Sequence, residues 1–465
     1  MSPKPSPIAI PVAFFSSLLP ELRKTIRLSL PIMLGQAGGG ILFVLDTMMA
    51  GALGDTALAA AGFVGNTVIL PVIFGFGLAS AVSVLIAQGR GAGRPQDAPA
   101  ALRHGLMACG AYGLLVGAGI HAAVLTGALG WFGQPPAVVS AGGDFAIWLG
   151  WATVPAMLFQ CMKNEREAEN QPWIALLWLG IGVLVNAALN WVLMFGNYGA
   201  PALGLAGAGI GTFVARTVSL IGITIHPGGL RPRWRDGMSL RWFRALFSLG
   251  IPSAVQWTFE VGVFTCAAIL MGSLGEKHLA AHQITVSLAT FAFMFPAGLS
   301  QGASIRVGEA YGRRDAPAMR RISFGAVLFG GFVMGLYGLL LLLFRHEVPA
   351  IYLSAEKSSP ETLLLASQFL FAAALFSICD GLQVVASGAL RGMSDVKFAS
   401  ASAFVCYWLV SLPVAYLLMR LTNLQGMAIW LGLSCGIFSA AVILNARLLS
   451  NLKKAATGAL WSGKV

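Results

Sequence analysis

Three acidic residues lie inside long apolar stretches of the sequence. Asp46 lies in GILFVLDTMMAG, Glu260 in QWTFEVGVF and Asp380 in FSICDGLQVVASGALRG. An ionisable side chain is costly in such surroundings and usually has a function there. A carboxylate in an apolar cavity attracts a proton, a metal ion or an organic cation as its counter-charge. We therefore expect the three acids to bind cations; the alternative is that each acid is bonded to a neighbouring helix and only fixes packing.

Amide side chains accompany these acids. Asn186 and Asn190 are four residues apart and share one face of a helix, where they could line a cavity and bind a cation or a substrate. Interhelical hydrogen bonds, worth about 1 kcal/mol each, are the alternative role. The same two roles are open for the glutamines Gln256, Gln283 and Gln383.

Large apolar side chains near the acids could hold flat lipophilic cations by stacking and cation–π contact. Phe293 and Met294 are the main candidates for the cavity. Taken singly, each such residue also suits a lipid-facing or core position. The other members of this set are Phe43, Met48, Phe259, Phe264 and Phe295.

The elements that must position these residues are membrane-spanning helices. Of the 465 residues, 57% are apolar and only 10% are charged, whereas a soluble domain has roughly a quarter charged residues. This composition excludes an ordinary soluble globular protein. Apolar runs of about 20 residues predict an all-α membrane protein with twelve transmembrane helices, at 26–51, 60–87, 100–128, 142–162, 173–196, 205–226, 245–271, 281–306, 320–345, 362–390, 397–420 and 427–449.

The basic residues predict the orientation of these spans. The net charge is +12, but the basic side chains form no single face or stripe, so nucleic acid is not an expected partner. Most Lys and Arg residues fall in the segments on the side of the N-terminus, which indicates that both termini are cytoplasmic. The loops on the other side hold only Lys277, Arg345, Lys357 and Arg420, and Arg216 lies inside the sixth span.

Two other features support a membrane protein without a cofactor or disulfide framework. The stretch Ile8–Leu19 is apolar but lacks a small-x-small cleavage site, so it predicts a helix on the inner membrane surface and not a signal peptide. The cysteines lack C-x-x-C spacing and are interpreted as small buried hydrophobic residues. They are Cys109, Cys161, Cys266, Cys379, Cys406 and Cys435.

The chain contains an internal repeat. A shift of 221 residues superposes Gly51 on Gly272 and Gly54 on Gly275, and with three residues deleted Asp97 meets Asp315. Six spans in each half mean that both halves enter the membrane from the same side, as a parallel repeat. The predicted organisation is an N-terminal cytoplasmic segment at 1–24, six-helix bundles at 25–230 and 245–450, a basic linker at 231–244 and a cytoplasmic tail at 451–465.

The repeat also relates the acids. It places Glu260 on the position of Gly39, seven residues before Asp46. Seven residues are two helical turns, so the two acids occupy matching faces at depths that differ by about 10 Å. Each half thus carries an acid on its first span.

Several motifs resemble the multidrug and toxic compound extrusion (MATE) family, in particular its NorM-like bacterial branch. They are LDTMMAGALG, NAALNWVLMFG, FEVGVF, LAAHQITVSLATFAFMFPAGLSQGAS, RVGEAYGRRD and DGLQVVASGALRG. The resemblance runs from about residue 15 to 450. It implies a monomeric secondary antiporter in the bacterial inner membrane, which exports cationic, lipophilic compounds by alternating access in exchange for sodium ions or protons and needs no other cofactor.

The resemblance also assigns residues. The family acids map on Asp46, Glu260 and Asp380, so Glu260 and Asp380 are the expected ligands of a sodium ion if sodium is the coupling ion. The family amides map on Asn186 and Asn190, and on Gln283. Family members often carry a tyrosine one turn before the tenth-span acid, where this sequence has Phe376. The missing hydroxyl leaves sodium and proton coupling both open.

Three other functions fit the sequence less well. Gly298–Gly302 match the G-x-S-x-G motif of hydrolases, but the motif lies in an apolar helix with His282 many turns away, so no enzyme is expected. A flippase for a lipid-linked saccharide is the main alternative, although an anionic cargo would favour several basic residues and only Arg216 lies deep in a span. A channel would keep a continuous pore, and two repeated bundles favour alternating access.

Overall fold

The computed structural model describes residues 12–232, 234, 237–349 and 360–462, without the side chains of residues 12–17 and 41–44. Helices form all of the regular structure in this described part of the chain. In a bilayer every backbone amide must be bonded within the protein, and a helix bonds them within its own segment. The predicted all-α class is thus confirmed.

Six predicted spans fall in each half of the chain. We call α1–α7 the N-terminal half; its helices are α1 (Val12–Ala52), α2 (Asp55–Gly91), α3 (Ala98–Leu125), α4 (Pro136–Trp151), α5 (Thr153–Ala168), α6 (Pro172–Phe195) and α7 (Leu205–Ile225). The C-terminal half contains α8 (Leu240–Ser273), α9 (Glu276–Gly312), α10 (Ala316–Leu343), α12 (Pro360–Gly392), α13 (Val396–Ala403), the π-helix η5 (Phe404–Ser411), α14 (Leu412–Leu421) and α15 (Gly426–Ala456).

Twelve helical segments of the described chain are long and apolar enough to cross a membrane, which confirms the predicted number of spans. Most are longer than the apolar runs that predicted them, because a helix continues past the hydrocarbon core into the interface. The fourth span consists of α4 and α5, and the eleventh consists of α13, η5 and α14.

The prediction of a separate surface helix at Ile8–Leu19 is wrong from Val12 onward. Residues Val12–Leu19 form the first turns of α1, which continues without interruption into the first span, past Pro20. Residues 8–11 of this prediction lie outside the described part of the chain. The apolar composition of Val12–Leu19 suits a helix that extends the span as well as one that lies along the surface.

The backbone repeats the pattern found in the sequence. Left-handed residues occur in pairs about 221 positions apart: Gly54 with φ 110° and Gly275 with φ 113°, and Gly204 with φ 55° and Gln425 with φ 45°. Two further pairs are Gly93 with Arg314 and Asn170 with Ser394. Each pair marks equivalent turns between spans, so the backbone follows the same path in the two halves.

The halves pack against each other through repeat-related contacts. A Cβ on Gly77 of α2 would lie 2.6 Å from the backbone N of Ala254 on α8, and a Cβ on Gly298 of α9 would lie 2.7 Å from Cα of Met33 on α1. Gly77 and Gly298 are 221 residues apart, as are Met33 and Ala254. Only glycine permits these approaches, because the partner is backbone.

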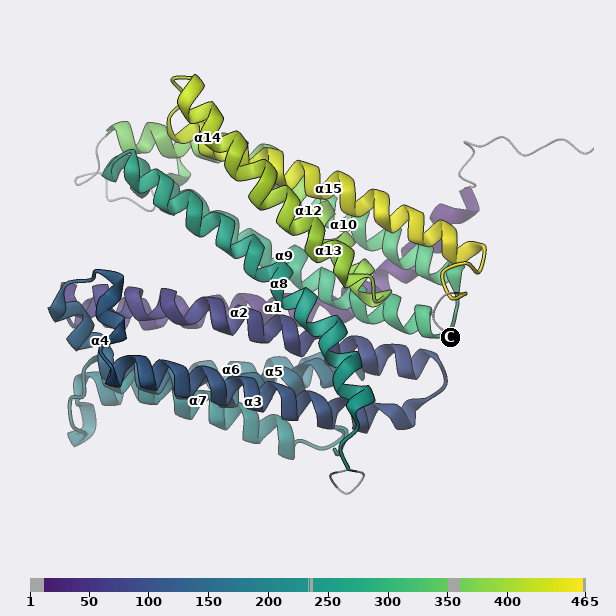
Figure 1. Cartoon of the computed structure of the whole chain (residues 1–465), viewed down its shortest axis with the longest axis horizontal. Coiled ribbons are helices and arrows are strands. Elements are labelled where there is room, and N and C mark those ends of the chain that lie inside the picture. Colours follow the sequence, from purple (N-terminus) through teal and green to yellow (C-terminus); the bar gives the residue numbers. More distant parts are fainter. Residues whose placement is uncertain (1–11, 233, 235–236, 350–359, 463–465) are drawn as a thin grey trace, which may run out of the picture.

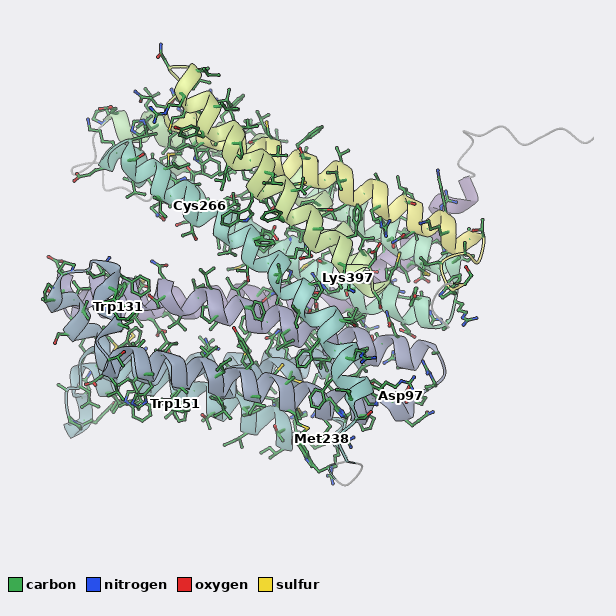
Figure 2. The ribbon with its side chains drawn as sticks, in the orientation of Figure 1. Asp97, Trp131, Trp151, Met238, Cys266 and Lys397 are labelled. Atoms are coloured by element: carbon green, nitrogen blue, oxygen red, sulfur yellow. The ribbon has the colours of Figure 1, made fainter. Side chains whose placement is uncertain are left out.

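Contacts between the halves gather at one end of the molecule. They involve the second parts of α2 and α9 and the first parts of α1 and α8, and the ribbons diverge toward the other end (Figure 1). Asp97 and Lys397 lie toward the convergent end, and Trp131 lies toward the divergent end (Figure 2). The predicted cytoplasmic segments, which carry most of the basic residues, are at the convergent end.

Polar side chains bridge the halves at this convergent end. Gln301 of α9 directs Nε2 toward Ser83 Oγ at 3.1 Å, Asn164 Oδ1 at 3.2 Å and Glu167 Oε2 at 3.3 Å. We call these four residues the bridging network. All four are buried, with Gln301 the most exposed at 8%. Because buried amides and carboxylates need partners, the network holds α9 against α2 and α5.

Candidate functional site

Two of the predicted acids meet in the C-terminal half. Gln383 Nε2 donates to Glu260 Oε1 at 3.0 Å and to Asp380 Oδ1 at 3.2 Å. Asp380 and Gln383 are three residues apart on α12, so helical spacing places them on one face. That face turns toward Glu260 on α8. A single amide therefore joins two carboxyl groups that are 120 residues apart in sequence.

Burial makes this arrangement electrostatically costly. Asp380 is 7% exposed and Gln383 is 2% exposed, while Glu260 is half-buried. Among the described residues, neither carboxylate has a basic nitrogen within 4.0 Å. Two buried carboxylates repel each other when both are charged, and a bound cation or proton relieves that repulsion.

A tyrosine from the eleventh span completes the cluster. The Tyr407 hydroxyl donates to Glu260 Oε1 at 3.5 Å, and Tyr407 itself is 2% exposed. It lies in the π-helix η5, and such segments frequently occur at functional sites. We call Glu260, Asp380, Gln383 and Tyr407 the carboxylate cluster.

Aromatic rings adjoin the carboxylate cluster. Phe259, which precedes Glu260, lies 6.0 Å from Trp408 and 5.3 Å from Phe404, measured between ring centroids. Trp408 Nε1 also donates to the Phe259 carbonyl oxygen at 3.3 Å. The π-helix thus supplies both the hydroxyl and a group of rings next to the acid.

Arg391 is a buried basic residue of the C-terminal half. Arg391 lies near the end of α12, is 4% exposed and places its guanidinium 5.0 Å from the centroid of the Trp257 ring. It also acts electrostatically on Glu260. The sequence analysis assigned Arg391 to a loop because its predicted span ended one residue earlier, and helix boundaries are uncertain at that scale.

The N-terminal half contains a separate polar chain. Asn190 Nδ2 donates to Asp46 Oδ1 at 2.7 Å and to Asn186 Oδ1 at 3.2 Å, and Asn186 Nδ2 donates to Thr212 Oγ1 at 3.1 Å. Both asparagines are fully buried, and Asn190 Oδ1 has no hydrogen-bond partner. Arg216 on α7 acts electrostatically on Asp46. Asp46 therefore forms its own site with α6.

The two sites follow one scheme. In each half, the fifth span donates a hydrogen bond to the acid of the first span: Asn190 to Asp46, and Tyr407 to Glu260. A shift of 221 superposes Asn186, one turn before Asn190, on Tyr407. Tyr407 was missed in the sequence analysis, although the repeat applied to the fifth span would have drawn attention to it.

The remaining predicted residues lie on α9, outside both sites. Gln283 is exposed, and Phe293 and Met294 are half-buried. Gln283 and Met294 are eleven residues apart, about three helical turns, so they share a face. Met294 lies against Gly40 of α1, which shows that this face is directed toward the N-terminal half.

The other apolar candidates have varied positions. Met48 is 68% exposed and Phe295 is 41% exposed, whereas Phe264 is half-buried beside the C-terminal core. The side chain of Phe43 lies outside the described part of the chain. Of the described members of this set, only Phe259 has a ring contact that belongs to a site.

The hydrolase motif has a packing role. Ser300 lies in the middle of α9, and its hydroxyl donates to the Val384 carbonyl oxygen on α12 at 2.8 Å. A nucleophilic serine in this motif requires a strand-to-helix turn, whereas the helix around Ser300 is continuous. His282, on the same helix, is 1% exposed and lies against Trp430.

The arrangement can bind a cation through oxygen atoms. In the described part of the chain, no group of three or more His, Cys, Asp and Glu side chains is close enough to hold a metal ion. The carboxylate cluster offers carboxylate oxygens from two residues and the hydroxyl of Tyr407, which suit a hard cation or a proton.

Known proteins are similar to this chain over most of its length. The sequence pattern of the MatE family matches residues 31–192 and 252–417. The chain is 35% identical to a probable multidrug resistance protein NorM of Mesorhizobium japonicum, over 92% of this chain and 94% of that protein. It is 36% identical to a protein of the same description from Rhodopseudomonas palustris, over 91% of this chain and 90% of that protein.

Solved structures share the fold. A eukaryotic MATE transporter, AtDTX14, superposes with a TM-score of 0.81 at 23% identity, over 95% of this chain and 99% of that chain. A structure described as the outward-facing conformation of a multidrug resistance MATE family transporter superposes with a TM-score of 0.84 at 18% identity, over 94% of this chain and 97% of that chain. These similarities extend over both halves.

Proposed function

The chain belongs to the MatE family of membrane transporters, as its motifs indicated, and we propose that it exports cationic, lipophilic compounds in exchange for sodium ions or protons. It is a multi-pass membrane protein, and its NorM relatives are bacterial. We propose a monomer in the bacterial inner membrane with both termini in the cytoplasm, on the basis of the distribution of Lys and Arg.

The carboxylate cluster carries this proposal. Glu260 and Asp380 share Gln383 as a hydrogen-bond donor and have no ion-pair partner among the described residues. A site with this charge gains free energy when any cation enters, because Coulomb attraction is strong where water is excluded. A proton, a sodium ion and an organic cation are then competing ligands for one pair of carboxylates.

Competition at one site produces exchange. Entry of the coupling ion from outside displaces the organic cation, and entry of the organic cation from inside displaces the ion. Phe259, Phe404 and Trp408 beside Glu260 suit the ring systems of a lipophilic cation. Asp46 and Asn190 provide a second ionisable site in the other half.

Exchange also requires the site to open alternately to the two sides. Among the described residues, contacts between the halves gather at the convergent end, which is the expected cytoplasmic end, and this supports an outward-facing state (Figure 1). In an inward-facing state the contacts of Gly77 and Gly298 and the bridging network must separate. Two rigid halves related by a repeat can rock about such a contact.

The alternative cargo, a lipid-linked saccharide, would require basic groups that bind its phosphates. Arg391 interacts electrostatically with Glu260 and Arg216 with Asp46, so each of these basic residues already has an acidic partner. The carboxylate cluster has two acids against one basic residue, Arg391, and this net negative charge favours a cationic cargo. Tight binding of an anionic lipid-linked saccharide by the purified protein, with no response to organic cations, would overturn the proposal.

Proteoliposomes test the proposed function directly. The purified protein is reconstituted, and export of ethidium is measured under an imposed sodium gradient and, separately, under an imposed proton gradient. Transport driven by one of these gradients is expected, and Glu260→Gln is expected to abolish it. Ethidium transport that needs neither gradient would contradict antiport.

A further inference from the structure

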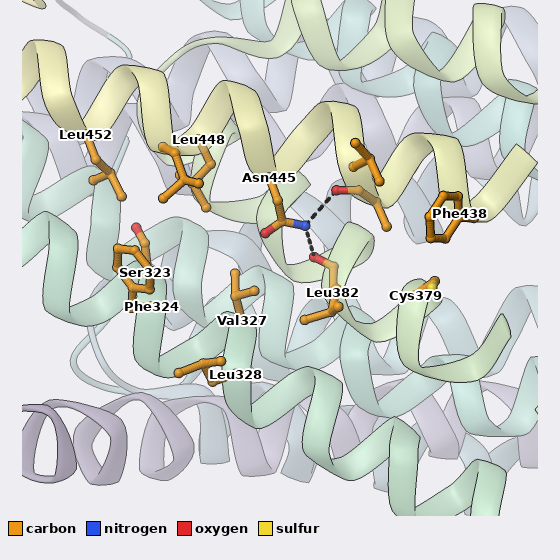
Figure 3. A pocket seen from close by; sticks show the side chains of 13 residues that line it. Ser323, Phe324, Val327, Leu328, Cys379, Leu382, Phe438, Asn445, Leu448 and Leu452 are labelled. Carbon is orange, nitrogen blue, oxygen red and sulfur yellow. Dashed lines mark hydrogen bonds between the residues drawn. The ribbon is translucent and has the colours of Figure 1, made fainter. Parts of the chain in front are cut away.

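An apolar groove lies on the surface of the C-terminal half, outside both candidate sites. It has a volume of about 330 Å³ and lies between α10, α12 and α15. Figure 3 shows the side chains that line it, among them Ser323 and Phe324 of α10, Leu382 of α12, and Leu448 of α15. Ligand pockets in proteins begin at about this size.

The side chains at the rim of the groove are exposed on the outer surface of the protein. Leu328 is 54% exposed, Phe438 is 59% exposed and Val442 is 53% exposed, although all three are large and apolar. In a chain that spans a membrane, such a rim is in contact with lipid. The groove extends along α15 from Phe438 to Leu452, about 21 Å of helix. One leaflet has a hydrocarbon thickness of about 15 Å, so the groove is long enough to hold an acyl chain over the full depth of a leaflet.

The floor contains a hydroxyl without a partner. Ser323 is fully buried, its Oγ has no hydrogen-bond partner, and it faces α15 across the groove (Figure 3). Asn445 on α15 uses its amide nitrogen on the carbonyl oxygens of Ala441, at 2.8 Å, and Leu382, at 3.4 Å. Ser323 and Asn445 are the hydroxyl and amide side chains of a lining that is otherwise apolar.

Basic residues stand at that same end. Arg320 precedes Ser323 and Phe324 by one helical turn on the same face of α10, and its guanidinium lies 5.7 Å from the centroid of the Phe324 ring. Lys453 follows Leu449 by one turn on α15. Both are exposed. The adjacent Lys454 points away from the groove, because two successive residues differ by about 100° around a helix.

We infer that the groove binds an anionic glycerophospholipid from the leaflet on the side of the C-terminal tail. Arg320 and Lys453 attract the headgroup, and one acyl chain lies along Leu382 and Leu448. The repeat gives no equivalent in the N-terminal half, where Leu102 takes the position of Arg320. Since Cys379 lines the groove and precedes Asp380, the lipid packs behind the turn of α12 that carries that acid.

Native mass spectrometry of the purified full chain tests this inference, with phosphatidylglycerol and phosphatidylcholine of identical acyl chains as the probes. The wild type should bind one phosphatidylglycerol more tightly than phosphatidylcholine. Arg320→Gln and Lys453→Gln should each weaken phosphatidylglycerol binding about fivefold, because a basic residue near an anionic membrane surface contributes about 1 kcal/mol. Phosphatidylcholine binding should not change.

Two controls separate the groove from general surface charge. Lys454→Gln removes the same charge from the opposite face of α15 and should leave both affinities unchanged. Ala441→Phe fills the groove and should reduce binding of both lipids. Equal affinity of the wild type for the two lipids would overturn the inference, as would equal effects of Lys453→Gln and Lys454→Gln. The exposed charge variants decide the question even if Ala441→Phe fails to fold, and the outcome is independent of transport activity.

Discussion

The Tyr407 hydroxyl lies 3.5 Å from Glu260 Oε1, although the two residues are 147 positions apart in the sequence. The contact matters because Phe376 stands where related proteins often have a tyrosine near the tenth-span acid. Phe376 stacks on Trp430 with ring centroids 5.9 Å apart, so it belongs to the apolar core. A hydroxyl therefore reaches the carboxylate cluster from the eleventh span.

We predict that Tyr407→Phe weakens coupling-ion binding about fivefold. The substitution removes one hydrogen bond to a carboxylate and keeps the ring, and one such bond is worth about 1 kcal/mol. The KM for the coupling ion in proteoliposomes is the measurement. Tyr416→Phe, on the exposed side of the same span, is the control. An unchanged ion dependence would exclude Tyr407 from the site.

We predict that Glu260→Gln and Asp380→Asn each abolish gradient-driven transport while the protein still reaches the membrane. Each substitution keeps hydrogen-bonding capacity but removes the charge that binds cations. Drug resistance of cells that express each variant is the measurement. Glu276→Gln, an exposed acid at the start of α9, should retain full resistance. Full resistance with either cluster variant would remove that acid from the mechanism.

We predict that Asp46→Asn slows transport without loss of drug binding. Asparagine can still accept the hydrogen bond from Asn190 Nδ2, so the variant mimics a permanently protonated acid. Ethidium binding and transport rates, measured on the same preparation across a range of pH, separate the two effects. Wild-type rates at every pH would mean that Asp46 only supports packing.

We predict that Gln301→Leu weakens the contact between the two halves at the convergent end. It leaves Asn164 Oδ1 and the buried Glu167 carboxylate without their shared donor, at a cost of about 1–3 kcal/mol. Spin labels on cysteines introduced at 93 and 314 should report longer distances between the halves. Gln283→Leu makes the same change on an exposed part of the same face of α9 and should leave the distances unaltered. Identical distributions for both variants would show that Gln301 does not hold the halves together.

We predict that Gln425→Gly stabilises the protein by about 1 kcal/mol. Gln425 has φ 45°, a left-handed conformation that strains a side chain, and the equivalent turn of the N-terminal half has Gly204 with φ 55°. The midpoint of thermal unfolding in detergent should rise. The reverse exchange, Gly204→Gln, should lower it, and a lower midpoint for Gln425→Gly would contradict the strain.

The sequence by itself determined the class of fold, the number of spans, the repeat and the positions of the three acids within the spans. These features depend on local properties. A run of about 20 apolar residues must form a helix in lipid because its backbone has no other partner there, and a charged residue within such a run is evident without any contact. Asn186 and Asn190 were also found locally, from their spacing on one helix.

Only the tertiary structure determined which helix faces pack against one another. Gln383 was one of several ambiguous glutamines until α8 and α12 packed together and placed it between Glu260 and Asp380. The π-helix that carries Tyr407 changes the register of the side chains along its span, so helical periodicity could not have assigned Tyr407 to the cluster. The groove beside Ser323 also forms only where α10, α12 and α15 pack together. Contacts of this kind depend on the packing of segments distant in sequence, which composition and spacing do not determine.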